Sequence, residues 1–136
     1  MKKLYLKKLP GFTLTELLVV LVIVGILVLL ALPKLMPLIS RAKSTEAQIA
    51  LGTLHSFEKK FFYMKSKYSA NLEDIDFEQE KLVTEGGSAN YKIEIIEAST
   101  TGFKARATAV VDFNGNGKFN VWEIDQDKNL VEVTKD

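Results

Sequence analysis

The chain of 136 residues contains no cysteine, one histidine and three prolines. Without cysteine, disulfides and thiolate metal sites are excluded, and no redox compartment can be inferred. The single histidine, His55, leaves little material for acid–base chemistry. We therefore predict that the protein is not an enzyme, with no catalytic residues and no required cofactor. The length suits one modest domain plus an anchor.

The chain also lacks a strong overall charge, but its formal net charge of +1 hides blocks of different sign. Residues 1–11 carry four lysines and no acidic residue, whereas residues 34–68 have a net charge of +5 and residues 69–136 a net charge of −7. No block combines enough basic and interleaved aromatic residues to predict a nucleic-acid surface. Because the C-terminal block is acidic, direct contact with nucleic-acid phosphates is not expected.

Residues 17–32 form a run of sixteen residues without a charged or hydrogen-bonding side chain. As a helix, residues 12–32 would be about 31 Å long, which matches a bilayer hydrocarbon core of ~30 Å. The preceding lysines place the N-terminus in the cytoplasm. A secretory signal peptide would need small residues after the run, where only Ala31 is found. A plain membrane anchor does not explain Glu16, because a carboxylate costs about 2.5–3.5 kcal/mol at a bilayer centre.

The N-terminal sequence MKKLYLKKLPGFTLTELLVVLVIVGILVLLALP resembles that of type IV pilins and type II secretion pseudopilins. This family has a short basic leader that ends in glycine, then a phenylalanine, and a glutamate as the fifth residue of the mature chain. Gly11, Phe12 and Glu16 match those positions. Gly25 and Pro33 also fall where the family often has helix breakers.

The resemblance implies that a prepilin peptidase cleaves the chain after Gly11 and that the new terminus at Phe12 is N-methylated. It also implies that Glu16 of one subunit pairs with the terminal amine of a neighbour as a filament grows from an inner-membrane assembly platform. Physical chemistry agrees, because removal of the leader lysines leaves the Phe12 ammonium as the cation near the depth of Glu16. The subunit's own amine, four residues away on the same helix face, is an alternative partner before assembly.

The helix is expected to continue beyond the membrane, because residues 40–68 change to an amphipathic pattern. A continuous helix over residues 12–68 would be roughly 85 Å long, which indicates a stalk whose second half packs on a head. The residues expected to face that head are Ala47, Ala50, Leu54, Phe57, Phe61, Met64 and Tyr68.

Helix breakers make residues 25–33 the weakest part of this helix. Pro33 and Pro37 each clash with the preceding turn, and Gly25 lowers helix propensity by about 1 kcal/mol. Two interpretations stay open: a simple kink where the helix leaves the membrane, or a segment that melts and extends when the subunit packs into a filament.

Beyond residue 68 the hydrophobic period changes to two, with turn signals at STTG, NGNG and DQDK. We predict a four-stranded antiparallel meander whose apolar face is covered by the helix, in an α+β, pilin-like fold. The cysteine pair that closes the C-terminal loop in many pilins is missing, so this C-terminus needs another lock. The expected strands are residues 91–97, 103–113, 121–124 and 130–133. The expected domains are a leader at 1–11, a transmembrane and polymerisation helix at 12–36, an amphipathic helix at 37–68 and a β-sheet head at 69–136.

The segment DFNGNGKFNVWE, residues 112–123, fits the EF-hand loop pattern in every fixed position. Gly117 permits the tight turn around which oxygen ligands would converge. Strands rather than helices flank the segment and only two ligands are charged, so a weak calcium site of ~10⁻⁴–10⁻³ M is expected. The alternative is a metal-free hairpin turn formed by two Asn-Gly pairs. The predicted calcium ligands are Asp112, Asn114, Asn116, the main-chain carbonyl of Lys118, and Glu123.

The sequence thus predicts a structural subunit of a type IV pilus-like filament, with copies of itself, prepilin peptidase, the assembly platform and membrane lipid as partners. It would cross the bacterial inner membrane once before assembly and lie in an extracellular pilus or periplasmic pseudopilus afterwards. Two alternatives stay open: a major pseudopilin of a type II secretion system, and a membrane-tethered binding domain that never polymerises.

Overall fold

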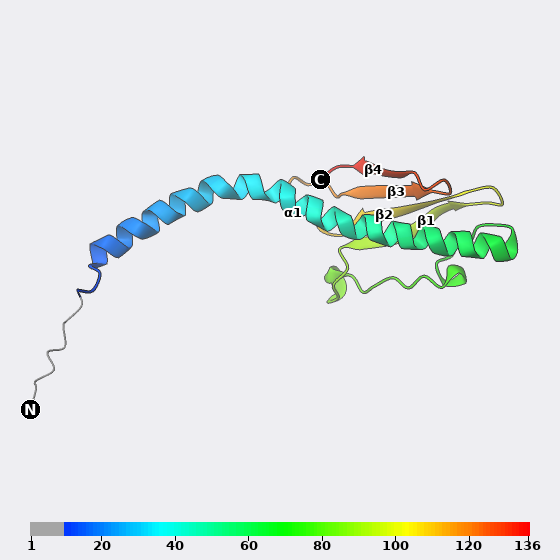
Figure 1. The fold of residues 1–136 in the computed structure, drawn as a ribbon, viewed down its shortest axis with the longest axis horizontal. Coiled ribbons are helices and arrows are strands. Elements are labelled where there is room, and N and C mark those ends of the chain that lie inside the picture. The colour runs from blue at the N-terminus through cyan, green and yellow to red at the C-terminus, as the bar shows by residue number, and fades with distance from the viewer. Residues whose placement is uncertain (1–9) are drawn as a thin grey trace, which may run out of the picture. The chain divides into compact units, whose positions relative to one another are not determined.

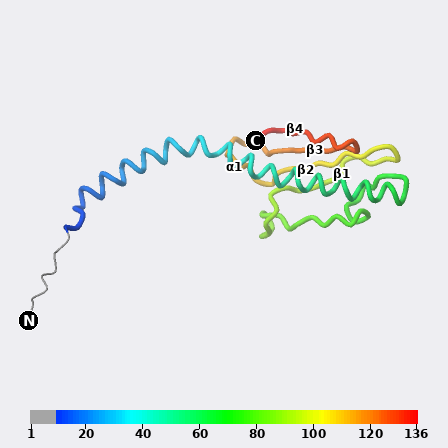
Figure 2. Tube along the Cα trace, in the orientation of Figure 1, coloured from blue at the N-terminus to red at the C-terminus, as the bar shows by residue number. Residues whose placement is uncertain are grey.

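The computed structural model describes residues 10–136, so the lysines of the predicted leader lie outside the described residues. The fold is α+β, with one long helix and a four-stranded antiparallel sheet, as predicted (Figure 1). The chain path runs from the helix through two short 3₁₀ turns into the sheet (Figure 2). The elements are α1 Leu14–Lys65, η1 Glu73–Ile75, η2 Val83–Glu85, β1 Tyr91–Ala98, β2 Phe103–Ala109, β3 Val121–Asp125 and β4 Leu130–Thr134.

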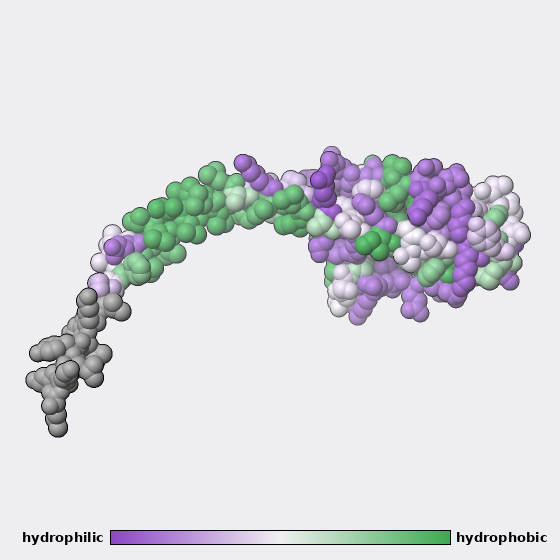
Figure 3. Space-filling view, viewed as in Figure 1, coloured by the Kyte–Doolittle hydropathy of each residue, from purple (hydrophilic) through white to green (hydrophobic). Residues whose placement is uncertain are grey.

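The chain divides between Leu35 and Met36 into two compact units. In the first unit, residues 17–32 of α1 carry no polar side chain on any side of the helix, and their large side chains are exposed. The face seen in Figure 3 is correspondingly hydrophobic. A helix that is hydrophobic all round suits a membrane span. Among residues 10–136, α1 is the one helix with the length and composition for a span, and its most apolar window has a mean hydropathy of 3.0.

Helix α1 continues through Gly25, Pro33 and Pro37 without a break in its helical assignment. Proline in a helix interior removes one hydrogen bond and costs about 3 kcal/mol. The residues between Gly25 and Pro33 therefore remain the weakest part of α1. Melting in an assembled filament stays a prediction.

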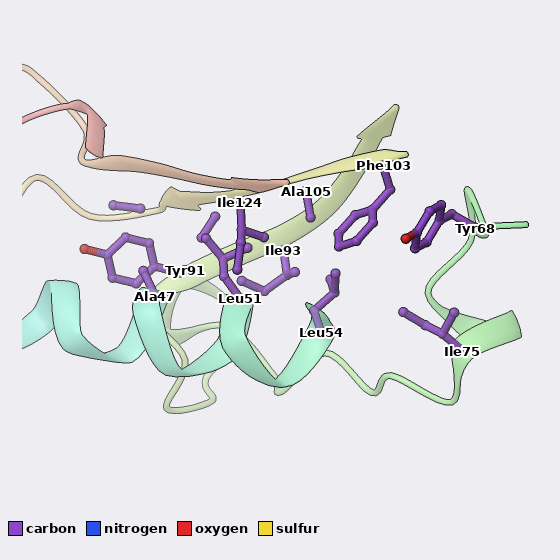
Figure 4. Close-up of a cluster of buried hydrophobic side chains, with 12 residues drawn as sticks. Ala47, Leu51, Leu54, Tyr68, Ile75, Tyr91, Ile93, Phe103, Ala105 and Ile124 are labelled. Carbon is purple, nitrogen blue, oxygen red and sulfur yellow. The ribbon is translucent and has the colours of Figure 1, made fainter. Parts of the chain in front are cut away.

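In the second unit, the C-terminal half of α1 packs on one face of the sheet (Figure 4). Leu51 and Leu54 are fully buried against the strands, where Ala105 and Ala107 present only a methyl group to the helix. Replacing either leucine with alanine would cost about 2–5 kcal/mol. The buried hydrophobic core consists of Ala47, Leu51, Leu54, Tyr68, Ile75, Tyr91, Ile93, Phe103, Ala105, Ala107, Ala109 and Ile124.

The predicted core-facing stripe of α1 is mostly confirmed. Ala47, Leu54 and Tyr68 are buried, and Ala50, Phe57 and Phe61 pack partly buried against the core. The prediction for Met64 is wrong, because its side chain is 62% exposed. α1 ends at Lys65, and Ser66, with a φ of 55°, turns the chain away from the helix axis.

The sheet is the predicted meander in the order β1-β2-β3-β4. The predicted end of β2 is wrong, because the strand ends at Ala109 rather than at Phe113. The last bond between β1 and β2 runs from the Val110 N–H to the Asn90 carbonyl, and residues 110–120 form a loop. Val111 is therefore exposed, while Phe113 is half-buried with its ring 5.8 Å from that of Tyr91.

The C-terminal strand is held by a buried amide rather than a cysteine pair. Asn120 is fully buried, and its Nδ2 donates to Glu132 Oε1 at 2.8 Å and to the Thr134 carbonyl at 3.0 Å. Its Oδ1 accepts from the Tyr91 hydroxyl at 2.7 Å. One side chain thus joins β4 to β1 across the sheet. These hydrogen bonds form the lock that holds the C-terminal strand in place of a disulfide.

Candidate processing and assembly site

The predicted cleavage position lies in chain without regular secondary structure, just before α1. A Cβ atom added at Gly11 would meet nothing within 4 Å, and the Gly11 backbone is not left-handed. The fold therefore gives no reason for glycine at this position. A requirement for a small residue at position 11 would have to come from a partner protein that binds this segment.

Phe12 follows directly and is 91% exposed. Its side chain packs on no core, so the bond between Gly11 and Phe12 is accessible from the surrounding medium. Exposed, irregular chain of this kind is where proteolytic cleavage usually occurs. The structure thus places both predicted processing residues in exposed, irregular chain, and cleavage after Gly11 stays a prediction.

Glu16 lies in the first turn of α1, and its carboxylate is hydrogen-bonded to Thr13. Oε2 accepts from the Thr13 backbone N–H at 2.7 Å and from the Thr13 hydroxyl at 2.9 Å. In return, the Glu16 backbone N–H donates to Thr13 Oγ1 at 3.2 Å. This reciprocal pattern is a capping box, in which a threonine and a glutamate three residues later satisfy the free donors of a helix N-terminus.

The capping box explains how a carboxylate can sit at the head of an apolar helix. The helix dipole favours a negative charge at the N-terminus, and the two Thr13 donors replace part of the hydration that Glu16 would lose. Among residues 10–136, Oε1 of Glu16 accepts no hydrogen bond, so one carboxylate oxygen remains available for a further donor.

Sequence reasoning assigned Glu16 to an amine and missed Thr13. The signal was present, because TLTE at residues 13–16 fits the threonine-x-x-glutamate signature directly before an apolar run. Pairing with the Phe12 amine, in the same subunit or a neighbour, stays a prediction.

In the predicted calcium loop, Asp112 organises the backbone. Its Oδ2 accepts from the Gly117 N–H at 2.6 Å, and its Oδ1 accepts from the Asn114, Gly115 and Asn116 N–H groups at 3.2, 2.7 and 3.2 Å. These donors, Gly117 first, hold the pKa of Asp112 below its ordinary value. The carboxylate is therefore ionised at neutral pH and fixed at the centre of the loop.

The two asparagines continue this arrangement. Asn114 Oδ1 accepts from the Asn116 N–H at 2.9 Å, and Asn116 Oδ1 accepts from the Lys118 N–H at 2.7 Å. Gly115 and Gly117 have φ values of 76° and 82°, which the two Asn-Gly turns require. The structure thus brings Asp112, Asn114 and Asn116 into one compact loop.

Glu123 does not join this loop. It lies in β3, where its Oε1 accepts from Nε and Nη2 of Arg106 in β2 at 2.8 and 2.6 Å. Within residues 10–136, no group of three or more histidine, cysteine or acidic side chains could hold a metal ion. Coordination by Glu123 would require its release from Arg106, and calcium binding stays a prediction.

Comparison with known proteins gives a family match and a relative. Residues 7–32 match the family described as the prokaryotic N-terminal methylation motif. Over 71 residues the chain is 39% identical to the type IV major pilin protein PilA of Myxococcus xanthus strain DK1622, an alignment that covers 52% of this chain and 32% of that protein. The chain thus matches about a third of the length of this relative.

Proposed function

From the match of residues 7–32 to the N-terminal methylation motif and the 39% identity to a type IV major pilin, we propose that the chain is a member of the type IV pilin and pseudopilin family. In this proposal it is a membrane-inserted filament subunit, cleaved after Gly11 and N-methylated at Phe12. In this function, the apolar half of α1 anchors the subunit in the inner membrane before assembly. The same helix surface then packs against other subunits in the filament. The partners are copies of the chain, prepilin peptidase and an inner-membrane assembly platform.

The observation that carries the proposal is the half-occupied carboxylate of Glu16. Thr13 binds Oε2 and fixes the direction of the side chain, while Oε1 accepts nothing within the described chain. Cleavage creates an ammonium at Phe12, a strong donor for a carboxylate in a medium of low dielectric. A neighbour's Phe12 amine can therefore bind Glu16 without displacing Thr13, so the capping box prepares the assembly contact.

The family includes both pilus and secretion subunits. The relative from Myxococcus xanthus is a type IV major pilin, which favours a pilus over a type II secretion pseudopilus. We keep the pseudopilin as the second candidate. A tethered domain that never polymerises would leave the half-occupied Glu16 carboxylate without a role. The 112–123 loop is a candidate calcium site in the head.

Three substitutions separate the roles of the Glu16 side chain. Glu16→Gln keeps a capping-box residue but removes the charge, Glu16→Leu removes both, and Thr13→Val removes the hydroxyl but keeps the charge. If an ion pair drives assembly, Glu16→Gln and Glu16→Leu should both lose most filaments, while Thr13→Val should lose fewer. Filament yield is measured by shearing filaments from cells, with inserted and cleaved subunit in the membrane fraction as the control.

Normal filament yield from Glu16→Gln would show that the charge is not the assembly contact. No pelletable filament from the parent chain, although the subunit is cleaved and inserted, would favour the non-polymerising domain.

A further inference from the structure

The two edges of the sheet differ in how they are protected. At β1, Gln79 lies along the edge, where its Oε1 accepts from the Ile93 N–H at 2.7 Å and its Nε2 donates to the Tyr91 carbonyl at 3.2 Å. β4 forms the other edge. An uncovered edge strand with apolar side chains is a surface to which another chain can bind.

The β4 side carries an exposed apolar surface, which we call the β4 ridge: Val131, Val133 and Lys135. The two valines are 55% and 53% exposed, and Lys135 follows with the same alternation. Glu132 points away from the ridge, since its carboxylate accepts from buried Asn120. The ridge is therefore apolar with a positive charge at one end.

The β1 side carries a groove with the opposite charge. The acidic groove lies between α1 and residues 77–80, has a volume of about 550 Å³, and is lined by apolar side chains that include Ile49, Phe77 and Ile93. Glu78 and Glu80 are exposed beside it. Residues 71–85, which contain this wall, carry six acidic residues and one lysine.

The ridge and the groove lie at the same level of the sheet. The strand register pairs Ile93 with Ala107, Ala107 with Trp122, and Trp122 with Glu132. Ile93 lines the groove and Glu132 stands between the ridge valines, so the two surfaces are separated by three strand spacings, about 14 Å. The ridge valines alternate with Glu132 and lie on the sheet face away from α1, whereas the groove lies on the α1 side. A second copy must therefore be turned as well as displaced sideways to bring its ridge to this groove, with little shift along the strands.

We propose that the β4 ridge of one subunit docks in the acidic groove of a neighbouring copy. This proposal rests on the proposed filament function. Val131 and Val133 cover the apolar floor, and Lys135 lies beside Glu78 and Glu80. The valines replace contact with water by contact with Ile49 and Phe77, which is the main gain, and the charges set the register and exclude the wrong edge.

The contact is heterologous, because the two surfaces differ and lie on opposite sides of the head. A heterologous contact leaves one ridge and one groove free in every pair of copies, so it propagates into a ring or an open helical array. An isologous contact, in which one patch meets itself, would stop at a dimer. This difference can be measured.

Cross-linking of the full chain tests the geometry, since the natural sequence has no cysteine. Ile49→Cys with Val133→Cys places one thiol in the groove and one on the ridge. In filaments on cells, a short bis-maleimide reagent should convert this variant into a ladder of multimers, while each single cysteine variant should give few cross-links. The control, Tyr63→Cys with Val133→Cys, carries a thiol outside the groove at a position even more exposed than Ile49, and it should give no ladder.

Charge reversal tests the register. Glu78→Lys with Glu80→Lys should lower the cross-linked fraction several-fold, and the further change Lys135→Glu should restore it. Lys60→Glu, on neither surface, should leave it unchanged. Normal filaments with no ladder, or an equal ladder from the Tyr63 pair, would overturn the contact while leaving the filament function intact. Absence of filaments from the parent chain would refute the filament function and this contact together.

Discussion

Helix α1 carries two glutamates that differ in burial, the exposed Glu16 and the buried Glu58. Glu16 is exposed and meets donors at the N-terminus of α1. Glu58 is fully buried, with Oε2 accepting from the Ser69 N–H at 3.0 Å and Oε1 without a hydrogen-bond partner among the described residues. Burial raises the pKa of Glu58, the Ser69 N–H lowers it, and the charge of Asp74 raises it further, to a value above the ordinary one.

The raised pKa of Glu58 predicts a pH dependence of stability. Folding favours the protonated form, so the contribution of Glu58 to stability is fully present below its ordinary pKa of 4.5 and is lost as the pH rises through the folded-state value. At neutral pH, Glu58→Gln should therefore raise the free energy of unfolding, on the order of 1 kcal/mol, by removing a buried charge with an unpaired oxygen. Thermal melting of the detergent-solubilised chain, followed by circular dichroism from pH 4 to pH 8, measures the effect.

The control is Glu78→Gln, which changes an exposed carboxylate and should leave the pH profile as it is. A parent profile that is flat across this range, with Glu58→Gln no more stable than the parent, would contradict the assignment.

At the residue scale, the sequence predicts local chemistry and misses what tertiary contacts create. Gly11, Phe12 and Glu16 are recognised because they form one short motif. Glu58 belongs to no such motif. Its place four residues after Leu54 puts it on the buried face of α1, but nothing in the sequence shows that the Ser69 N–H will reach its carboxylate. The Arg106–Glu123 pair is missed for the same reason, since it depends on the register of β2 and β3.

At the element scale, Asp112 closes the loop between β2 and β3 through its own hydrogen bonds. Four backbone N–H groups donate to this one carboxylate. The Asp112 carboxylate therefore points into the loop, while the Glu123 carboxylate is paired with Arg106. Calcium would therefore have to compete with hydrogen bonds that already exist, which agrees with weak affinity.

Calcium binding has a reporter in Trp122, the single tryptophan, which adjoins Glu123 in β3. Calcium at about 100 times its dissociation constant would add roughly 2.7 kcal/mol to the free energy of unfolding. The melting temperature of the chain should then rise by about ten degrees or more, with a shift in tryptophan emission. Asp112→Ala should abolish both responses. Identical melting and emission curves in calcium and in chelator would show that the loop is a metal-free turn.

The lock formed by Asn120 predicts a local effect on β4. Asn120→Ala removes two donated hydrogen bonds and leaves the Tyr91 hydroxyl without its acceptor, which should cost about 1–3 kcal/mol. Hydrogen exchange of the β4 amides should accelerate more than that of β1 and β2. The exposed Asn71→Ala serves as the control and should change neither rate. Equal acceleration across the whole sheet would show that Asn120 stabilises the head as a unit and not β4 in particular.

The elements themselves follow closely from the sequence, because a change from helical to alternating periodicity is a strong signal. The end of β2 does not follow, since Val111 and Phe113 keep the alternation after the backbone has left the ladder. The last bonds of the ladder, from the Val110 N–H to the Asn90 carbonyl and from the Ala109 N–H to the Asn120 carbonyl, join residues that are distant in sequence, so the alternation alone does not predict where pairing ends.

At the scale of the whole molecule, removal of the leader determines the N-terminus of the mature subunit. The proposed cleavage removes residues 1–11, with all four leader lysines, and leaves the apolar half of α1 attached. Gly11→Leu should block cleavage and retain the leader, whereas Gly11→Ala should be cleaved in part, since the site itself has room for a methyl group. Mass spectrometry of the membrane fraction should find N-methylated Phe12 at the start of the parent chain. A parent chain that begins at Met1 or after Ala31 would contradict the family's processing.

The exposed apolar surface of the first unit has a consequence for where a filament can grow. Residues 17–32 include fourteen large apolar side chains, and transfer of each into water costs about 1.5–3 kcal/mol, roughly 20–40 kcal/mol in all. A subunit therefore has no route through the aqueous phase to a distant tip. It can leave lipid only by moving directly onto other helices, so the proposed filament would lengthen and shorten at its base, where it meets the bilayer, and the bilayer itself would serve as the store of subunits.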